Sequence, residues 1–441
     1  MSNKTHLFRN ILSLGVVQIA NYVLPLISIP IIVRVIGPDN FGVINYYTAF
    51  VAYFMLLINY GFEYSGTRFI AIERDNIERR NSHFTKILYA KSLLFVLSAI
   101  IFSGAIIFIS RSTAETRVAG YTFLMAFSWV LSPNWFFQGM QQLTLVALFN
   151  FLSKLVFNVL IVIVIKQKGD YVWQPLILSL TQIVVSAVSL FYAIKKFNVS
   201  LVKISFRSVI DMLREDRMIF FSMLSTNLYT DTNIVMLGFF ETKEHIGYFT
   251  AAWRLMFVFL VLLSLPTSQA MFPYIASSFA KNVDRGIAQI KRVLPVIIYA
   301  SLALSIFLFF TAELIIRGFY GQNFGPAVIV FRILTIVPVL SFINTVLGLQ
   351  TMVNLKMDSA YFYIIFSGGL CSILLNLVMI RFYGYRGSAW SWIAAESLIA
   401  IVLHLHLRKK GYQLFQAKYF NPITVVAEIK NMVSNFKKRG I

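Results

Sequence analysis

The sequence is poor in cysteine and in charged residues. It has one cysteine, Cys371, so no disulfide can form within the chain. Charged residues make up only 13% of its 441 residues, whereas hydrophobic residues make up 58%. A soluble domain carries roughly 25% charged residues, so this composition excludes an ordinary soluble domain and predicts a polytopic membrane protein.

Sequence motifs for catalysis are missing as well. There is no Walker A sequence and no paired cysteine cluster, and the five histidines lie in loops or near the ends of apolar segments. No loop is long enough to hold a globular catalytic domain. We therefore expect no enzyme activity, no ATP hydrolysis, and no metal or organic cofactor.

Apolar segments occupy most of the chain. Each one exceeds the roughly 20 residues that a helix needs to cross a bilayer. The sequence therefore predicts an all-α polytopic membrane protein with twelve transmembrane helices. The segments cover residues 11–34, 42–64, 86–109, 118–139, 143–165, 172–194, 218–240, 247–273, 294–316, 326–350, 359–380 and 386–407.

Basic residues are distributed unevenly between the two sets of alternating loops. The set that includes both termini contains 27 lysines and arginines, and the other set contains 9. Basic residues concentrate on the cytoplasmic side of membrane proteins, so both termini are predicted to be cytoplasmic. The net charge of +21 is explained by these loops and does not indicate nucleic-acid binding.

Two similar stretches indicate an internal repeat. FGVINYYTAF at 41–50 and IGYFTAAW at 246–253 each open a span with glycine, aromatic residues and a Thr-Ala pair. We predict two six-helix lobes related by a pseudo-two-fold axis, as in transporters built from repeats. The predicted parts are an N-terminal lobe at 1–195, a cytoplasmic amphipathic linker at 196–217, a C-terminal lobe at 218–407 and a basic amphipathic tail at 408–441, which we expect to bind anionic membrane lipids.

Three basic residues remain outside this loop count, and all three lie inside predicted spans. Lys154 is near the middle of LVALFNFLSKLVFNVLIVIVI, and Arg254 and Arg332 lie one to two turns from the outer ends of their spans. A lysine at that depth costs roughly 2.5 to 3.5 kcal/mol on insertion scales, so its presence suggests a function. A cavity lined by these cations would attract an anionic ligand, and phosphate suits both lysine and arginine.

Other polar residues complete the candidate site. Asp231 could form an ion pair with Arg254 or Lys154, or exchange a coupling cation. The remaining candidates are Arg34 as a further substrate-binding cation, Glu63 and Arg68 as coupling or ion-pair residues at the inner end of the second span, and Asn227, Asn233 and Gln138 as polar lining.

Several stretches together resemble the bacterial polysaccharide repeat-unit flippases. These are the O-antigen, Wzx-type group of the multidrug, oligosaccharidyl-lipid and polysaccharide exporter superfamily. The resemblance runs through most of the chain, and is carried by IGPDNFGVINYYTAF (36–50), NYGFEYSGTRFIA (59–71), NWFFQGMQQL (134–143), TDTNIVMLGFF with the following IGYFTAA, and GLQTMVNLKMD (348–358).

The resemblance implies a flippase of the bacterial inner membrane. Its substrate would be an undecaprenyl-diphosphate-linked oligosaccharide, moved from the cytoplasmic to the periplasmic leaflet by alternating access. A proton or sodium gradient would drive transport, and polysaccharide polymerase and chain-length machinery would be partners. One departure is that Asn59 and Tyr60 stand where an acidic residue is frequent in the family, which leaves Glu63 as a substitute for that acid.

Other functions remain open at this level. A flippase for lipid-linked peptidoglycan precursors, or a drug or metabolite antiporter of the same superfamily, would share the fold. A membrane polysaccharide polymerase or ligase would act on the same glycans, but such enzymes usually need a large periplasmic loop. The longest outer connection here is only about ten residues, and a cationic cavity fits cationic drugs poorly.

Overall fold

The chain folds into two helical units. The computed structural model describes residues 3–230 and 232–428, with the side chains of 3–27, 225–230, 262–270 and 273–274 excepted. No strand occurs within these described ranges, as the all-α prediction requires. The N-terminal unit comprises Met1–Gly238 and Thr242–Gly247, and the C-terminal unit comprises Phe239–Glu241 and Tyr248–Ile441. The predicted lobe boundaries at 195 and 218 stay a prediction.

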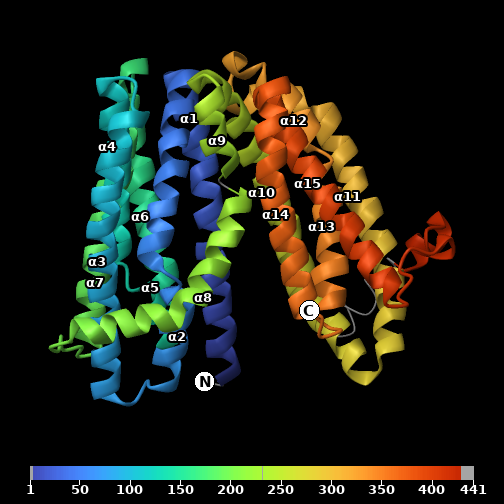
Figure 1. The fold of residues 1–441 in the computed structure, drawn as a ribbon, viewed down its shortest axis with the longest axis horizontal. Coiled ribbons are helices and arrows are strands. Elements are labelled where there is room, and N and C mark those ends of the chain that lie inside the picture. The colour runs from blue at the N-terminus through green and yellow to red at the C-terminus, as the bar shows by residue number, and fades with distance from the viewer. Residues whose placement is uncertain (1–2, 231, 429–441) are drawn as a thin grey trace. The chain divides into compact units, whose positions relative to one another are not determined.

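Long helices form the N-terminal unit, on the blue-to-green side of Figure 1. They are α1 (Asn3–Asn59), α2 (Phe62–Ile72), α3 (Ile77–Ile109), α4 (Thr113–Leu131), α5 (Asn134–Gly139), α6 (Leu143–Val164), the short 3-10 helix η1 (Lys168–Val172), α7 (Trp173–Lys196), α8 (Phe206–Thr230) and α9 (Thr232–Phe240).

The C-terminal unit is built in the same way. Helix α10 begins in the N-terminal unit and continues into this one. The elements are α10 (Lys243–Lys281), α11 (Val283–Tyr320), η2 (Gln322–Phe324), α12 (Ala327–Leu334), α13 (Val337–Thr345), the π-helix η3 (Val346–Met352), α14 (Asp358–Tyr383), α15 (Tyr385–Lys409) and η4 (Ala417–Tyr419).

The predicted spans fall on these helices. Eight helices within the described part of the chain are long and apolar enough to cross a membrane. The first two predicted spans lie together in α1, which has a non-helical residue at Gly37 with φ of 78°. The chain reverses there, because the N-terminus and α2 lie at the same end of the unit (Figure 1). Glycine adopts this left-handed conformation without strain.

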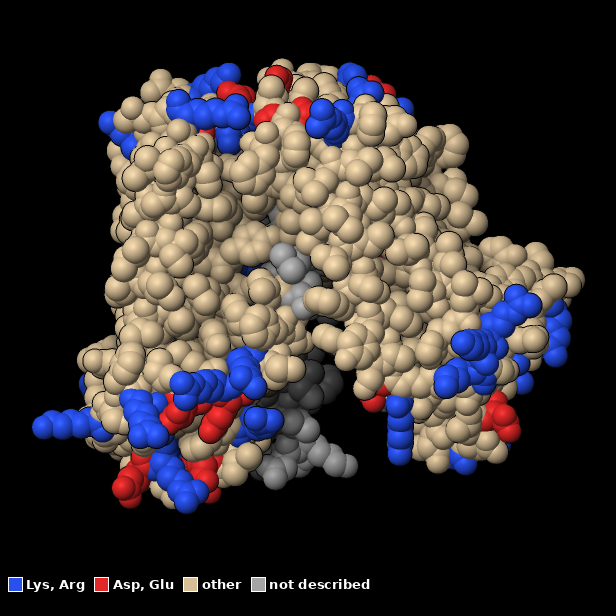
Figure 2. Space-filling model, in the orientation of Figure 1, with Lys and Arg blue, Asp and Glu red and all other residues tan. Residues whose placement is uncertain are grey.

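Apolar side chains cover the outside of the helices. In α3 and α6 only 17% and 11% of the most apolar stretch is buried within the protein. Exposure of apolar side chains such as Ile107, Phe108 and Ile163 would be unfavourable in water, but it is favourable where they contact lipid tails. On the face shown in Figure 2, the charged residues of the N-terminal unit gather at the ends of its helices and leave an apolar band between them.

Helix α8 connects the predicted linker to the seventh predicted span. Its buried residues Val209, Met212 and Asp216 recur every three to four positions, so they share one helix face, and α8 packs against α1, α2 and α3. The Ser65 hydroxyl donates a hydrogen bond of 2.7 Å to Asp216. Burial raises the pKa of Asp216, and this hydrogen bond opposes the rise. The linker is thereby fixed to the N-terminal unit.

Two glycines allow a close helix crossing in the N-terminal unit. A Cβ atom added to Gly42 in α1 would lie 2.8 Å from the nitrogen of Gly247 in α10, and one added to Gly247 would lie 3.3 Å from the nitrogen of Gly42. Each would also collide with a backbone carbonyl, of Lys243 and Pro38 respectively. Gly42 and Gly247 belong to the two repeated stretches of the sequence.

Candidate functional site

A polar cavity lies inside the N-terminal unit. Its volume is about 180 Å³, and its wall comes from α2, α3, α4, α5, α6, α7 and the turn between α4 and α5. The lining residues are Glu63, Lys91, Ser128, Trp129, Ser132, Asn134, Phe149, Asn150, Ser153, Lys154, Gln182, Val185, Ser186 and Ser189. Polar groups within a membrane helix bundle are costly, so a cavity lined by them is a candidate functional site.

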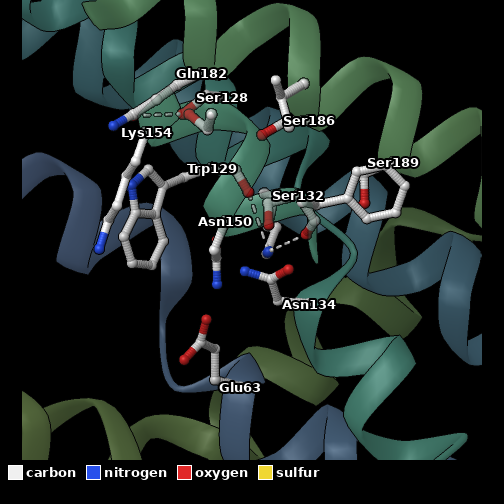
Figure 3. Close-up of a pocket in the computed structure, with 14 residues that line it drawn as sticks. Glu63, Ser128, Trp129, Ser132, Asn134, Asn150, Lys154, Gln182, Ser186 and Ser189 are labelled. Atoms are coloured by element: carbon white, nitrogen blue, oxygen red, sulfur yellow. Dashed lines mark hydrogen bonds between the residues drawn. The ribbon is translucent and has the colours of Figure 1, made fainter. Parts of the chain in front are cut away.

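Lys154 lies at this cavity. It is half-buried on α6, a helix with no other charged residue. Figure 3 shows its side chain extending beside Trp129 on one side of the cavity. The ammonium group therefore adjoins a polar space within a largely apolar helix, which explains how a lysine is tolerated there.

Glu63 occupies the other end of the cavity in this view. It stands in the first turn of α2, directly after a sharp turn in which Tyr60 and Gly61 both have positive φ values, 47° and 91°. Between Glu63 and Lys154 the side-chain amides of Asn134 and Asn150 project inward (Figure 3). The cavity thus combines an anionic end, an amide-lined middle and a cationic side.

Lys91 is a second lysine at the cavity, although its place near the start of a predicted span is that of a loop charge. It lies in α3 with 2% of its surface exposed. Its ammonium group donates to the carbonyl oxygens of Trp129, at 3.1 Å, and Ser132, at 3.4 Å. In a continuous α4 the Trp129 carbonyl would accept from the amide of residue 133, but Pro133 has no N–H. Lys91 therefore supplies the missing donor.

Helix α7 provides a hydroxyl-rich wall that was not predicted from the sequence. Gln182, Ser186 and Ser189 line the cavity at spacings of four and three residues, so they lie on one helix face. Ser128 lies within hydrogen-bonding distance of the Gln182 side chain, at 3.4 Å. This spacing is visible in the sequence, but isolated serines are compatible with any membrane helix. Hydropathy also does not distinguish a helix face that lines a cavity from one that faces lipid.

The other predicted residues lie elsewhere. Arg254 and Arg332 are half-buried in the C-terminal unit, and the Arg332 guanidinium lies 5.6 Å from the ring centre of Phe309. Asp231 lies outside the described residues, as does the side chain of Asn227. Of the remaining candidates, Arg34 and Arg68 are exposed, Asn233 is buried in α9, and Gln138 is half-buried in α5 outside the cavity wall.

Comparison with known proteins shows the family. The model of a family described as polysaccharide biosynthesis protein matches residues 7–279, which is more than half of the chain. The chain belongs to this family. A relative from Escherichia coli K12, described as a putative O-antigen transporter, is 28% identical over 408 residues, which is 92% of this chain and 98% of the relative. The name of this relative describes transport rather than catalysis, in line with the expectation of no enzyme activity.

Solved transporter structures share the fold of this family member. The lipid II flippase MurJ in an inward closed conformation superposes with a TM-score of 0.73 at 16% identity, covering 96% of this chain and 92% of MurJ. An inward-facing multidrug resistance MATE family transporter superposes with a TM-score of 0.69 at 15% identity, covering 88% of this chain and 94% of the transporter. The chain is therefore an all-α, multi-pass membrane protein with the twelve-helix, two-lobed fold predicted from its sequence.

Proposed function

We propose that this protein moves undecaprenyl-diphosphate-linked oligosaccharide repeat units across the bacterial inner membrane, from the cytoplasmic to the periplasmic leaflet. The observation that carries this proposal is the polar cavity with Lys154 inside a membrane helix bundle. The O-antigen transporter name of the Escherichia coli relative supports the choice of cargo. The translocated units would then pass to polymerase and chain-length machinery.

The diphosphate is the part of the cargo that cannot readily cross the hydrocarbon core without the protein. It carries at least two negative charges, which the hydrocarbon core excludes. Lys154, together with Arg254 and Arg332 and the outer Arg34, would replace water around these charges while the polyprenyl tail stays in lipid. In this mechanism lobes 1–195 and 218–407 rock about the linker 196–217, and both termini and the tail 408–441 remain cytoplasmic.

Ion coupling would use an acidic residue. Glu63 is the acidic side chain at the described cavity, and it shares that space with two lysines. A carboxylate next to cations can exchange a proton or sodium ion as the cargo phosphate enters and leaves, because the anionic cargo competes with it for the same cations. Asp231, with Arg254 or Lys154 as its partner, stays a candidate for the coupling acid, and Arg68 stays a candidate ion-pair residue beside Glu63.

The experiment that tests the proposal is sugar labelling in a strain that lacks the gene. Undecaprenyl-linked repeat units should accumulate facing the cytoplasm, and the intact gene should restore export. A Lys154→Gln protein should express and fold normally yet leave export reduced at least tenfold, because the ammonium contact with phosphate is lost.

Lys166→Gln is the matched control, since Lys166 follows the same helix at its exposed end. It should export normally. If repeat units reach the periplasm in the deletion strain and only long chains are missing, the protein is a polymerase or ligase and the transport proposal fails. Normal export by Lys154→Gln would remove Lys154 from the site.

A further inference from the structure

The cavity wall holds hydrogen-bonding groups that the protein does not use. The Ser189 hydroxyl is buried, at 1% exposure of the residue, and has no hydrogen-bond partner within the described part of the chain. The side chains of Asn134, Asn150 and Ser186 likewise make no hydrogen bond to another described residue. Of these four residues Ser189 is buried, Asn134 and Ser186 are half-buried and Asn150 is exposed to the cavity. Buried polar groups are nearly always paired, so the unpaired Ser189 hydroxyl points to an occupant that brings its own hydrogen-bonding group.

The unused groups lie around an aromatic ring. Figure 3 shows the Trp129 indole inside the cavity between Lys154 and Asn150, with Ser186 and Ser189 on the opposite wall. An indole offers a flat apolar surface, whereas amides and hydroxyls both donate and accept. An occupant that satisfies all of them has apolar C–H faces and a rim of hydroxyl groups, which is the chemistry of a sugar ring.

The size of the cavity agrees with one ring. A cavity of about 180 Å³ has room for several water molecules. A sugar ring can replace such waters bond for bond, and displacing water without losing its hydrogen bonds costs little.

We propose that this cavity binds one sugar ring of the lipid-linked glycan. Trp129 packs against a C–H face, Asn134 and Asn150 bind hydroxyls on one edge, and Ser186 and Ser189 bind hydroxyls on the other. The inference rests on the proposed function, since it states which part of the cargo enters the N-terminal unit. It makes this unit a determinant of sugar selectivity, in addition to its role in binding phosphate.

Sugar binding can be measured without any transport. The full chain in lipid nanodiscs is titrated with methyl hexosides and methyl N-acetylhexosaminides, and the thermal unfolding midpoint is followed for saturation. At least one probe should give a saturable rise, and glycerol at equal concentration should not. Ser186→Ala and Asn150→Ala should each weaken binding about five- to tenfold, the loss expected for one neutral hydrogen bond.

The aromatic contact is tested with a conservative pair. Trp129→Leu should abolish saturation, and Trp129→Phe should keep part of it because a ring remains. Two controls lie on α7 outside the cavity wall: Ser179→Ala, whose hydroxyl donates to the Tyr121 carbonyl, and Trp173→Leu, which is exposed. Both should bind as the unaltered protein does.

Failure of this inference is distinct from failure of the proposed function. If no probe saturates, or if the cavity variants bind as well as the controls, the cavity holds water only and the inference is overturned. Export at the normal rate by Trp129→Leu would also overturn it, while leaving the flippase proposal intact. Periplasmic accumulation of repeat units in the deletion strain would instead reject the flippase proposal, and with it a sugar site for cargo.

Discussion

At the scale of single residues, two lysines of one cavity have different environments. Lys91 is buried and donates to two backbone carbonyls at the break between α4 and α5, whereas Lys154 is half-buried beside open polar space. The first arrangement stabilises the fold, because a carbonyl left unpaired in the interior is costly. The second places a charged side chain at the wall of the cavity.

This contrast gives a prediction about Lys91. Lys91→Met should lower the free energy of unfolding by about 1–3 kcal/mol, because the carbonyls of Trp129 and Ser132 lose their donor. The measurement is denaturant or thermal unfolding of the purified protein in detergent. Lys86→Met, earlier on the same helix, is the control and should change stability little. Unchanged stability together with lost export would instead assign Lys91 to the binding site.

At the scale of elements, α2 and α5 pack against each other closely enough to fix the cavity. A Cβ atom on Gly139, the last residue of α5, would lie 2.6 Å from the Ile70 Cβ and 2.9 Å from the Thr67 carbonyl oxygen. The Thr67 hydroxyl also donates to the Trp135 carbonyl at 3.0 Å. These contacts hold Glu63 on α2 and Asn134 on α5 at the same cavity.

Substitution of Gly139 should therefore disturb this pair of helices. Gly139→Ala is expected to destabilise the protein by about 1–3 kcal/mol, the usual cost of overpacking a rigid contact. Gly120→Ala in α4 is the matched control, since a Cβ there meets nothing within 4 Å. That change should leave stability equal or raise it by up to about 1 kcal/mol through helix propensity. Equal melting temperatures for both variants would contradict the tight crossing.

Hydropathy predicts where the helices lie, but it predicts only some of the residues that line the cavity. A span must be continuously apolar to lie in lipid, so the positions of the helices follow from composition, and Lys154 stood out against its neighbours. The break at Pro133 was visible as a proline in the fourth span. Lys91 was not recognised, because its position near the start of a span is compatible with a loop charge. The serines of α7 were missed because their partners come from other helices.

At the scale of the whole molecule, the basic loops predict how the chain is oriented. The single native cysteine makes this easy to test, because Cys371→Ser gives a cysteine-free background. A cysteine at Lys168 should react with an impermeant maleimide in intact cells, and one at Lys203 only after the inner membrane is permeabilised. Both positions are exposed. The reverse labelling pattern would invert the topology and the direction of transport.

The crossing of Gly42 and Gly247 has a consequence for how the sequence can evolve. The two positions stand at matching places in the repeated stretches, and each faces the backbone of the other repeat. A side chain gained at either position pushes against the helix that carries its counterpart, and no compensating change can make the counterpart smaller than glycine. Each of the two glycines is therefore expected to tolerate no larger residue, whatever stands at the other position.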